Sequence, residues 1–228
     1  MQADSRPVSS NQQHIHPKLP ALIRRSISGA YKKPIAKYNR ESFEKLAQSL
    51  AERPRPLVID SFCGTGHSTA FLARRYPNHL VVGIDKSSSR LAKHPFSDND
   101  NYILLQAECE DVWRLLLDTG VNADFHYLLY PNPWPKSGHL QRRVHGHPSF
   151  QSLLKLGGKI ELRSNWQLYV EEFGTAMNLC GVHGNVTQYI PNEPITLFEK
   201  KYNSSGHQLW AFTADIQHSL QSPVTARR

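Results

Sequence analysis

Short apolar segments alternate with amphipathic segments along most of this chain, and this alternation limits the folds that it can adopt. We expect strands at 57–60, 80–85, 102–105, 125–130, 159–163 and 208–214, with helices at 39–51, 67–76, 109–117, 149–156 and 166–179. Strands that alternate with helices at this spacing are typical of parallel sheets covered by helices on both faces. The predicted fold class is therefore α/β, with a doubly wound, mostly parallel sheet.

The charge balance points to an anionic partner. The chain carries 27 Lys and Arg against 19 Asp and Glu, a formal net charge of +8. Such an excess favours a polyanion, nucleic acid above all, although a basic protein without such a partner is the alternative. No apolar run reaches the roughly 18 residues of a membrane span, and the polar start lacks the core of a signal peptide. The three cysteines are too scattered for a disulfide framework, so we expect reduced thiols in the cytoplasm.

The first 40 residues differ in composition from the rest of the chain. They are rich in Ser, Gln, Pro, Lys and Arg and show no clean periodicity, which is typical of a flexible arm. Arg24, Arg25 and Lys33 are among its cations. The arm is either a solvated tail or a segment that contacts RNA, and the sequence favours neither. Asn39 is expected to cap the helix that follows.

A glycine-containing turn, Asp-Ser-Phe-Cys-Gly-Thr-Gly at 60–66, follows the first predicted strand. Gly64 and Gly66 allow a sharp turn and the close approach of a ligand to the main chain. The next strand ends in Asp85, and an acid at that position can accept both ribose hydroxyls of a nucleoside. The pair indicates a nucleoside cofactor without separating NAD from S-adenosylmethionine, and an ordinary tight turn is the alternative. Thr69 stands where a dinucleotide motif would place a third glycine.

The loop after the fourth predicted strand, Tyr-Pro-Asn-Pro-Trp-Pro-Lys at 130–136, is the most informative stretch. Its prolines stiffen it, and it lies at the carboxyl end of a central strand, where doubly wound folds bind ligands. Trp134 offers a stacking face, and Lys136, Arg142 and Arg143 follow. Cations beside an aromatic ring suit a nucleotide, because phosphates pair with cations and bases stack.

Three segments together carry a family resemblance. They are Pro-Asn-Pro-Trp-Pro-Lys-x-x-His-x-x-Arg-Arg at 131–143, Leu-Gly-Gly-Lys at 156–159 with Ser164, Asn165 and Tyr169, and Thr-Leu-Phe-Glu at 196–199 followed by Gly-His. In this order they resemble the Pro-Asp-Pro-Trp-x-Lys, Gly-Gly with Thr-Asp and Tyr, and Thr-x-Phe-Glu motifs of the tRNA (guanine-N7)-methyltransferases. The resemblance covers about residues 55–214.

The resemblance implies a class I S-adenosylmethionine-dependent methyltransferase with a Rossmann-like sheet that acts on tRNA. It implies a methyltransferase domain at 41–215, after the arm at 1–40 and before a tail at 216–228. The implied cofactor-binding residues, with the glycine turn included, are Asp60, Gly64, Gly66, Asp85, Gln106 and Asn132. Asn132 takes the place of the aspartate that is regarded as catalytic in the family. The implied substrate-binding residues are Lys136, Arg142, Arg143, Asn165, Thr196 and Glu199. A monomer is favoured, and no metal or membrane partner is expected.

Three replacements set this chain apart from the family pattern: Asn at 132 and at 165, and Gln at 106, each where the family has Asp. Guanine N7 has a lone pair and no proton, so its methylation needs alignment rather than a general base. A hydrogen bond to a charged group contributes about 1.5–3 kcal/mol against about 0.5–1.5 for a neutral one. The loss of one carboxylate therefore predicts roughly tenfold weaker function, not an inactive protein.

The replacement at Asn165 bears on the identity of the base. An Asn side chain has one acceptor and one donor group, so it can recognise a base other than guanine. Guanine N7 of tRNA is the leading target. The alternatives are a non-catalytic or partner-dependent RNA-binding homologue, a methyltransferase for another base, and a small-molecule methyltransferase, against which the basic charge argues.

Overall fold

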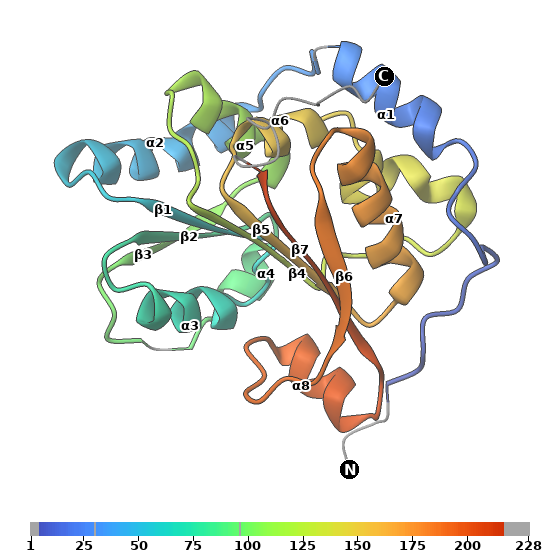
Figure 1. The fold of residues 1–228 in the computed structure, drawn as a ribbon. Coiled ribbons are helices and arrows are strands. Elements are labelled where there is room, and N and C mark those ends of the chain that lie inside the picture. Colours follow the sequence, from blue (N-terminus) through green and yellow to red (C-terminus); the bar gives the residue numbers. More distant parts are fainter. Residues whose placement is uncertain (1–4, 30, 96, 217–228) are drawn as a thin grey trace.

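A computed structural model describes residues 5–29, 31–95 and 97–216, which form one seven-stranded sheet covered by helices on both faces (Figure 1). The sheet has the order β3-β2-β1-β4-β5-β7-β6. Its strands are β1 (Leu57–Ser61), β2 (Leu80–Asp85), β3 (Tyr102–Gln106), β4 (Phe125–Leu129), β5 (Lys159–Ser164), β6 (Gly184–Tyr189) and β7 (Leu209–Asp215). The first five pair in parallel, and β7 pairs antiparallel with β5 and β6. The predicted doubly wound, mostly parallel α/β sheet is confirmed.

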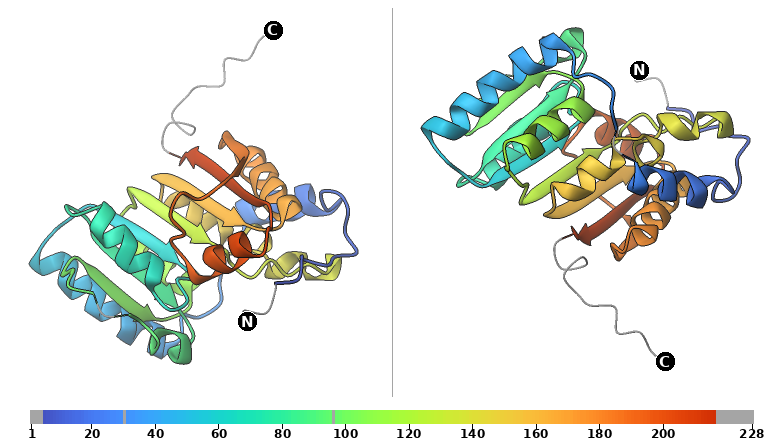
Figure 2. Two further views of the ribbon diagram at one scale, coloured as in Figure 1. Left: turned by 90° about the horizontal axis from the view of Figure 1, so that it is seen from below. Right: turned by 90° about the horizontal axis from the view of Figure 1, so that it is seen from above.

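The helices divide between two apolar cores, one on each face of the sheet. They are α1 (Leu19–Ser28), α2 (Lys37–Glu52), α3 (His67–Arg75), α4 (Ser88–Leu91), α5 (Cys109–Asp118), α6 (Phe150–Lys155), α7 (Gln167–Leu179) and α8 (Leu197–Ser204), with 3-10 turns η1 (Ser137–Arg142) and η2 (Val144–Gly146). The larger core contains residues of α1, α2, α5, α6 and α7, and the smaller one residues of α3. Figure 2 shows these two faces in turn. No helix within the described ranges is long and apolar enough to cross a membrane.

Burial along the strands explains which of them the sequence reveals. Every residue of β1 and β2 is buried, as expected for central parallel strands covered on both faces. Strand β6 lies at the edge of the sheet, and its residues are exposed or only partly buried. An edge strand needs no apolar run, so β6 was not predicted.

Asn39 does not cap a helix. Helix α2 begins two residues earlier, at Lys37, and Asn39 is fully buried within its first turns. Its side chain accepts a hydrogen bond from the Glu108 backbone N–H (3.0 Å) and donates one to the Asp111 carboxylate (2.7 Å). The residue therefore ties α2 to the start of α5, a tertiary role that its sequence position does not reveal.

The amino-terminal segment is packed, which differs from the flexible arm that its composition predicts. Leu19 and Ile23 lie one turn apart on α1 and are fully buried. Helix α1 contacts α6 and α7, and residues 5–16 run past α7 toward α8 (Figure 1). There the Ser5 backbone N–H donates to the hydroxyl of Ser205 (3.1 Å). The domain boundaries at 41 and 215 stay predictions.

The packing of α1 is tested by Leu19→Ala. Removal of a fully buried leucine side chain leaves a cavity, so the free energy of unfolding should fall by about 2–5 kcal/mol. Urea denaturation measures it, with Ile27→Ala as the matched control, because Ile27 is on the same helix but 41% exposed. The control should change stability by about 0.5 kcal/mol or less. A Leu19 variant as stable as the Ile27 variant would contradict the packed arrangement.

Candidate functional site

A cavity of about 520 Å³ opens at the carboxyl ends of the central strands. Phe62 follows β1, Asp85 ends β2, and Asn132 follows β4, and all three line the cavity. Strand β1 lies between β2 and β4, so the strand order reverses here. Open parallel sheets bind ligands at such a switch point, and this volume is within the usual range of small-molecule sites.

The backbone around this cavity is strained. Among the described residues other than glycine, those with positive φ are Phe62 (63°), Tyr130 (55°) and Trp134 (46°), and each lines the cavity. Side chains disfavour this left-handed region, and residues held in it cluster at functional sites because the surrounding structure must enforce it. The three left-handed residues therefore mark this cavity as a candidate functional site.

Asp85 presents a fixed carboxylate to the cavity. It is only 3% exposed, and its Oδ2 accepts from the Gly64 backbone N–H (3.0 Å), while Oδ1 accepts from the Ser87 N–H (2.8 Å). The Arg90 guanidinium lies 3.2 Å from Oδ1. Oδ1 thus faces two donors and Oδ2 one, so Oδ2 keeps a lone pair that can accept a hydrogen bond from a ligand hydroxyl.

The two glycines of the turn have different tasks. Gly64 has a φ of 61°, and a Cβ there would meet nothing within 4 Å, so the space beside it is open for a ligand. Gly66 has a φ of 76°, and its Cβ would lie 2.6 Å from the ring of His94. Gly66 therefore serves tight packing at the start of α3 rather than the cavity.

Asp60 lies beneath the turn and does not line the cavity. It is fully buried, and its Oδ2 accepts from the hydroxyls of Ser68 and Thr69 (2.7 Å each). Its Oδ1 has no hydrogen-bond partner among the described residues. Burial raises the pKa of Asp60 to about 6, against the lowering effect of the two hydroxyls and with a further raising effect from Asp85. Its predicted contact with a cofactor stays a prediction.

Glu108 lines the cavity, whereas Gln106, the residue singled out from the sequence, does not. Gln106 ends β3 and is exposed outside the cavity, and its carbonyl accepts from the hydroxyl of Ser42 (2.9 Å). Glu108 stands two residues further on, lines the cavity and pairs with Lys33 at 3.3 Å. Asp85 is the last residue of its strand, whereas Glu108 lies two residues past the end of β3, so a search of strand ends stops at Gln106 and misses it.

Asn132 stands at the rim of the cavity in the proline-rich loop. Its side-chain Oδ1 accepts from the Trp134 backbone N–H (3.2 Å), and this bond closes a local turn of the kind that Asn and Asp both form. The Arg142 guanidinium lies 4.9 Å from the Trp134 ring centroid, a cation–π contact. Asn132, Trp134 and Arg142 all line the cavity, and their predicted roles stay predictions.

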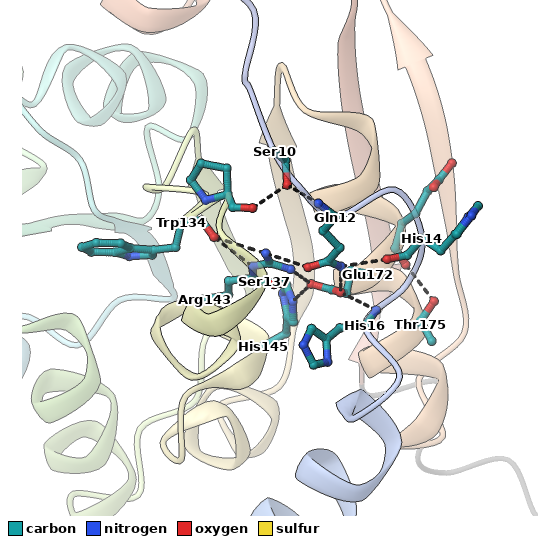
Figure 3. A network of polar contacts seen from close by, with 12 residues as sticks. Ser10, Gln12, His14, His16, Trp134, Ser137, Arg143, His145, Glu172 and Thr175 are labelled. Carbon is teal, nitrogen blue, oxygen red and sulfur yellow. Dashed lines mark hydrogen bonds and ion pairs between the residues drawn. The ribbon is translucent and has the colours of Figure 1, made fainter.

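Arg143 lies elsewhere than expected. It is fully buried, and its Nε and Nη2 both donate to the Trp134 carbonyl (3.2 Å each) (Figure 3). Its Nη1 pairs with Glu172, which also lies 2.9 Å from the His145 ring and accepts from the Gln12 amide (2.8 Å). These donors point inward rather than toward RNA, so the structure gives Arg143 the task of holding the loop.

The Glu172 carboxylate is ionised in this network. Burial would raise its pKa, but the hydrogen bond and charge of His145 and the charge of Arg143 lower it to about 2. The ordinary value is 4.5. A lowered pKa means that the ion pair stabilises the folded chain fully above the ordinary value, and that this contribution is lost as the pH falls toward 2.

A second buried carboxylate supports the opposite side of the cavity. Glu199 is fully buried and accepts from the Tyr130 hydroxyl (3.0 Å), from the Ile195 backbone N–H (2.7 Å) and from Arg163 (2.8 Å). Thr196 caps α8, and its hydroxyl accepts from the Glu199 N–H (2.9 Å). The substrate contacts of Thr196 and Glu199 stay predictions, and in this structure both residues hold protein groups.

The two remaining predicted residues lie outside the cavity. Lys136 is exposed and lines a shallow hollow with residues 9–11 of the amino-terminal segment. Asn165 is half-buried, and its Nδ2 lies 3.0 Å from the His207 ring. Several residues that were not singled out do line the cavity: Tyr31, Lys33, Phe62, Glu108, Val144, His147 and Phe198. Tyr31 and Lys33 were missed because their segment was interpreted as an arm.

Comparisons with known proteins agree with this geometry. Residues 54–212 match the family described as "Putative methyltransferase". The tRNA (guanine-N(7)-)-methyltransferase of Salmonella typhimurium is 26% identical over 174 residues, and that of Yersinia pestis is 28% identical over 174 residues. Each alignment covers 71% of this chain and 73% of the relative.

Solved structures show the fold. The 16S rRNA methyltransferase KamB is 19% identical with a TM-score of 0.56, covering 82% of this chain and 97% of that one. A 16S rRNA (adenine(1408)-N(1))-methyltransferase from Catenulisporales acidiphilia, with cosubstrate SAM, is 16% identical with a TM-score of 0.52, covering 79% and 93%. The fold is therefore that of class I methyltransferases.

The raised pKa of Asp60 predicts a pH effect on stability. The folded chain binds this proton more tightly than the unfolded chain, whose pKa is near the ordinary 3.8, so stability falls as the pH rises from there to about 6. Asp60→Asn removes the effect. The stability difference between wild type and variant, from urea denaturation, should decline by up to about 3 kcal/mol across this window. A difference independent of pH would contradict the assignment.

Glu172→Gln tests the network that holds the loop. The change leaves Arg143 buried without its partner, so the free energy of unfolding should fall by about 3–5 kcal/mol. Amide hydrogen exchange of residues 5–16 and of the loop at 130–136 should become faster. Glu171→Gln is the matched control, because Glu171 is the neighbouring residue and its side chain accepts a hydrogen bond from the Gln167 amide at the surface (2.7 Å). Equal effects of both variants would show that the network does not stabilise residues 5–16 or the loop at 130–136.

Proposed function

The chain belongs to this methyltransferase family, and on that premise we propose that it transfers a methyl group from S-adenosylmethionine to N7 of a guanine in tRNA. One arrangement carries the proposal: two carboxylates, Asp85 and Glu108, line the same cavity as the Asn132 and Trp134 loop. The acids suit a nucleoside cofactor, and the loop suits a nucleotide substrate. The motif at 131–143 and the relatives named tRNA (guanine-N(7)-)-methyltransferase support the choice of tRNA and of guanine N7.

The residues present fit S-adenosylmethionine. Asp85 ends β2, where an acid can accept ribose hydroxyls, and Glu108 offers a further acceptor two residues past β3. The open space beside Gly64 leaves room for a ligand along the main chain. When bound, this cofactor supplies an electrophilic methyl group on a sulfonium. The cavity lining carries four carboxylates, Asp85, Glu108, Glu110 and Asp111, against four cations, so it places no excess positive charge beside the sulfonium.

The protein's own contribution is alignment. Guanine N7 needs no deprotonation, so the site must hold the base in line and exclude water rather than move a proton. Trp134 is the natural stacking partner, because it is fixed at the rim by Arg142 and by the Arg143 bonds to its carbonyl. Asn132 orients the same loop through its bond to the Trp134 N–H.

Methyl transfer tests the proposal directly. Labelled S-adenosylmethionine and bulk tRNA from cells lacking this protein should give label in 7-methylguanosine, because the target guanosine is left unmethylated in such RNA. Label in another nucleoside would keep the enzyme class and move the specificity to residues such as Asn165. Cofactor binding without label on tRNA or rRNA would instead support the non-catalytic or partner-dependent alternative.

Asn132→Asp tests what the replacement at this position costs. A restored carboxylate would attract the sulfonium, so kcat/KM for the cofactor should rise roughly tenfold at neutral pH, while Asn132→Ala should lower it through loss of the turn. Asn178→Asp is the control, because it adds the same charge at an exposed position on α7 outside the cavity. An equal rise in the control, or no rise at position 132, would contradict a direct effect on the cofactor.

A further inference from the structure

A second hollow lies beside the cofactor cavity, between α1 and η1. This groove has a volume of about 570 Å³ and is lined by Lys18 at the start of α1, by Arg25 on that helix and by Arg142 from η1. Lys18 and Arg25 are seven residues apart, so both point from one face of the helix, about 10 Å apart along its axis. No Asp or Glu lines the groove.

Among the described residues, the cations of the groove have no counter-ion. Lys18, Arg25 and Arg142 are all exposed, and no carboxylate of the described residues lies within ion-pair distance of any of them. The basic residues of the neighbouring cavity differ: Lys33 pairs with Glu108 and Arg90 with Asp85. A concave surface that carries three cations without nearby carboxylates concentrates anions.

Arg142 connects the groove with the cavity. This residue lines both, and its guanidinium lies 4.9 Å from the Trp134 ring centroid at the cavity rim. Lys136 adds another exposed cation in a neighbouring hollow, which shares Ser137 and Gly138 with the groove. A chain of positive charge therefore runs from the point where a base would enter toward α1.

We propose that this groove binds the sugar–phosphate backbone of the RNA substrate next to the nucleotide whose base enters the cavity. The proposal rests on RNA being the substrate, as inferred above. It makes α1, which composition alone assigns to an arm, an RNA-binding element of the folded domain. Helix α1 can serve in this way because Leu19 and Ile23 anchor it to the core and the Glu172 network fixes the segment before it.

The test neutralises the groove without touching the cavity. The variant Lys18→Gln with Arg25→Gln is compared with Arg74→Gln with Lys155→Gln, which removes two exposed cations from the last turns of α3 and α6. Those helices lead into β2 and β5, so the control positions lie at the amino ends of the strands, opposite the carboxyl ends where the cavity opens. Binding of bulk tRNA without cofactor is measured at several salt concentrations, and methyl transfer gives KM and kcat. Thermal unfolding checks that each variant is folded.

Loss of two phosphate contacts should weaken tRNA binding roughly tenfold and reduce the slope of log affinity against log salt by about 1.4–1.8. The KM for tRNA should rise, whereas kcat and the KM for the cofactor should stay unchanged. The control variant should behave as wild type. An unchanged slope and affinity in the groove variant, or an equal loss in the control, would overturn the proposal. Because binding is measured without turnover, a wild-type protein that binds tRNA through the groove but transfers no methyl group would overturn the proposed function alone.

Discussion

The buried ion pair between Glu172 and Arg143 is the interaction on which the site depends. Both side chains are fully buried, and burial of two charges is costly unless further hydrogen bonds satisfy them. Here those bonds come from parts of the chain that are distant in sequence: the Gln12 amide and the His16 backbone N–H from the amino-terminal segment, and the carbonyl of Trp134 from the loop. One carboxylate on α7 thus joins the amino-terminal segment to the rim of the cavity.

The same principle holds on the other side of the cavity. Glu199 binds the Tyr130 hydroxyl, and Arg143 binds the Trp134 carbonyl. Tyr130 and Trp134 are two of the left-handed residues around the cavity, and such conformations persist only where surrounding contacts enforce them. Two buried carboxylates therefore hold the ends of the proline-rich loop in a conformation that its local sequence does not favour.

The sequence reveals the fold better than it reveals the site. The central strands could be predicted because β1 and β2 are buried along their whole length, whereas the exposed edge strand β6 has no apolar pattern. The family motif marked Arg143 and Glu199 as substrate-binding residues. It could not indicate that both are enclosed and support other residues, because burial depends on tertiary contacts. Glu108 was missed for a simpler reason: it lies two residues beyond the end of β3, and Gln106 occupies the last position of that strand.

Asn132 illustrates how little a replacement at a motif position can change locally. Its Oδ1 accepts from the Trp134 N–H, a bond that an aspartate would form equally well, so the loop geometry survives and only a charge is lost.

The cavity lining contains four cations, Lys33, Lys86, Arg90 and Arg142, and four carboxylates, Asp85, Glu108, Glu110 and Asp111. A carboxylate at 132 would tip this balance toward a cationic ligand. The cofactor's sulfonium is cationic before transfer and still largely so as the methyl group leaves. An added carboxylate therefore stabilises bound cofactor and transition state similarly, and such uniform binding changes KM rather than kcat. We expect the Asn132→Asp effect to appear mainly as a lower KM for the cofactor, with the methyl-transfer step governed by the alignment that the buried carboxylates maintain.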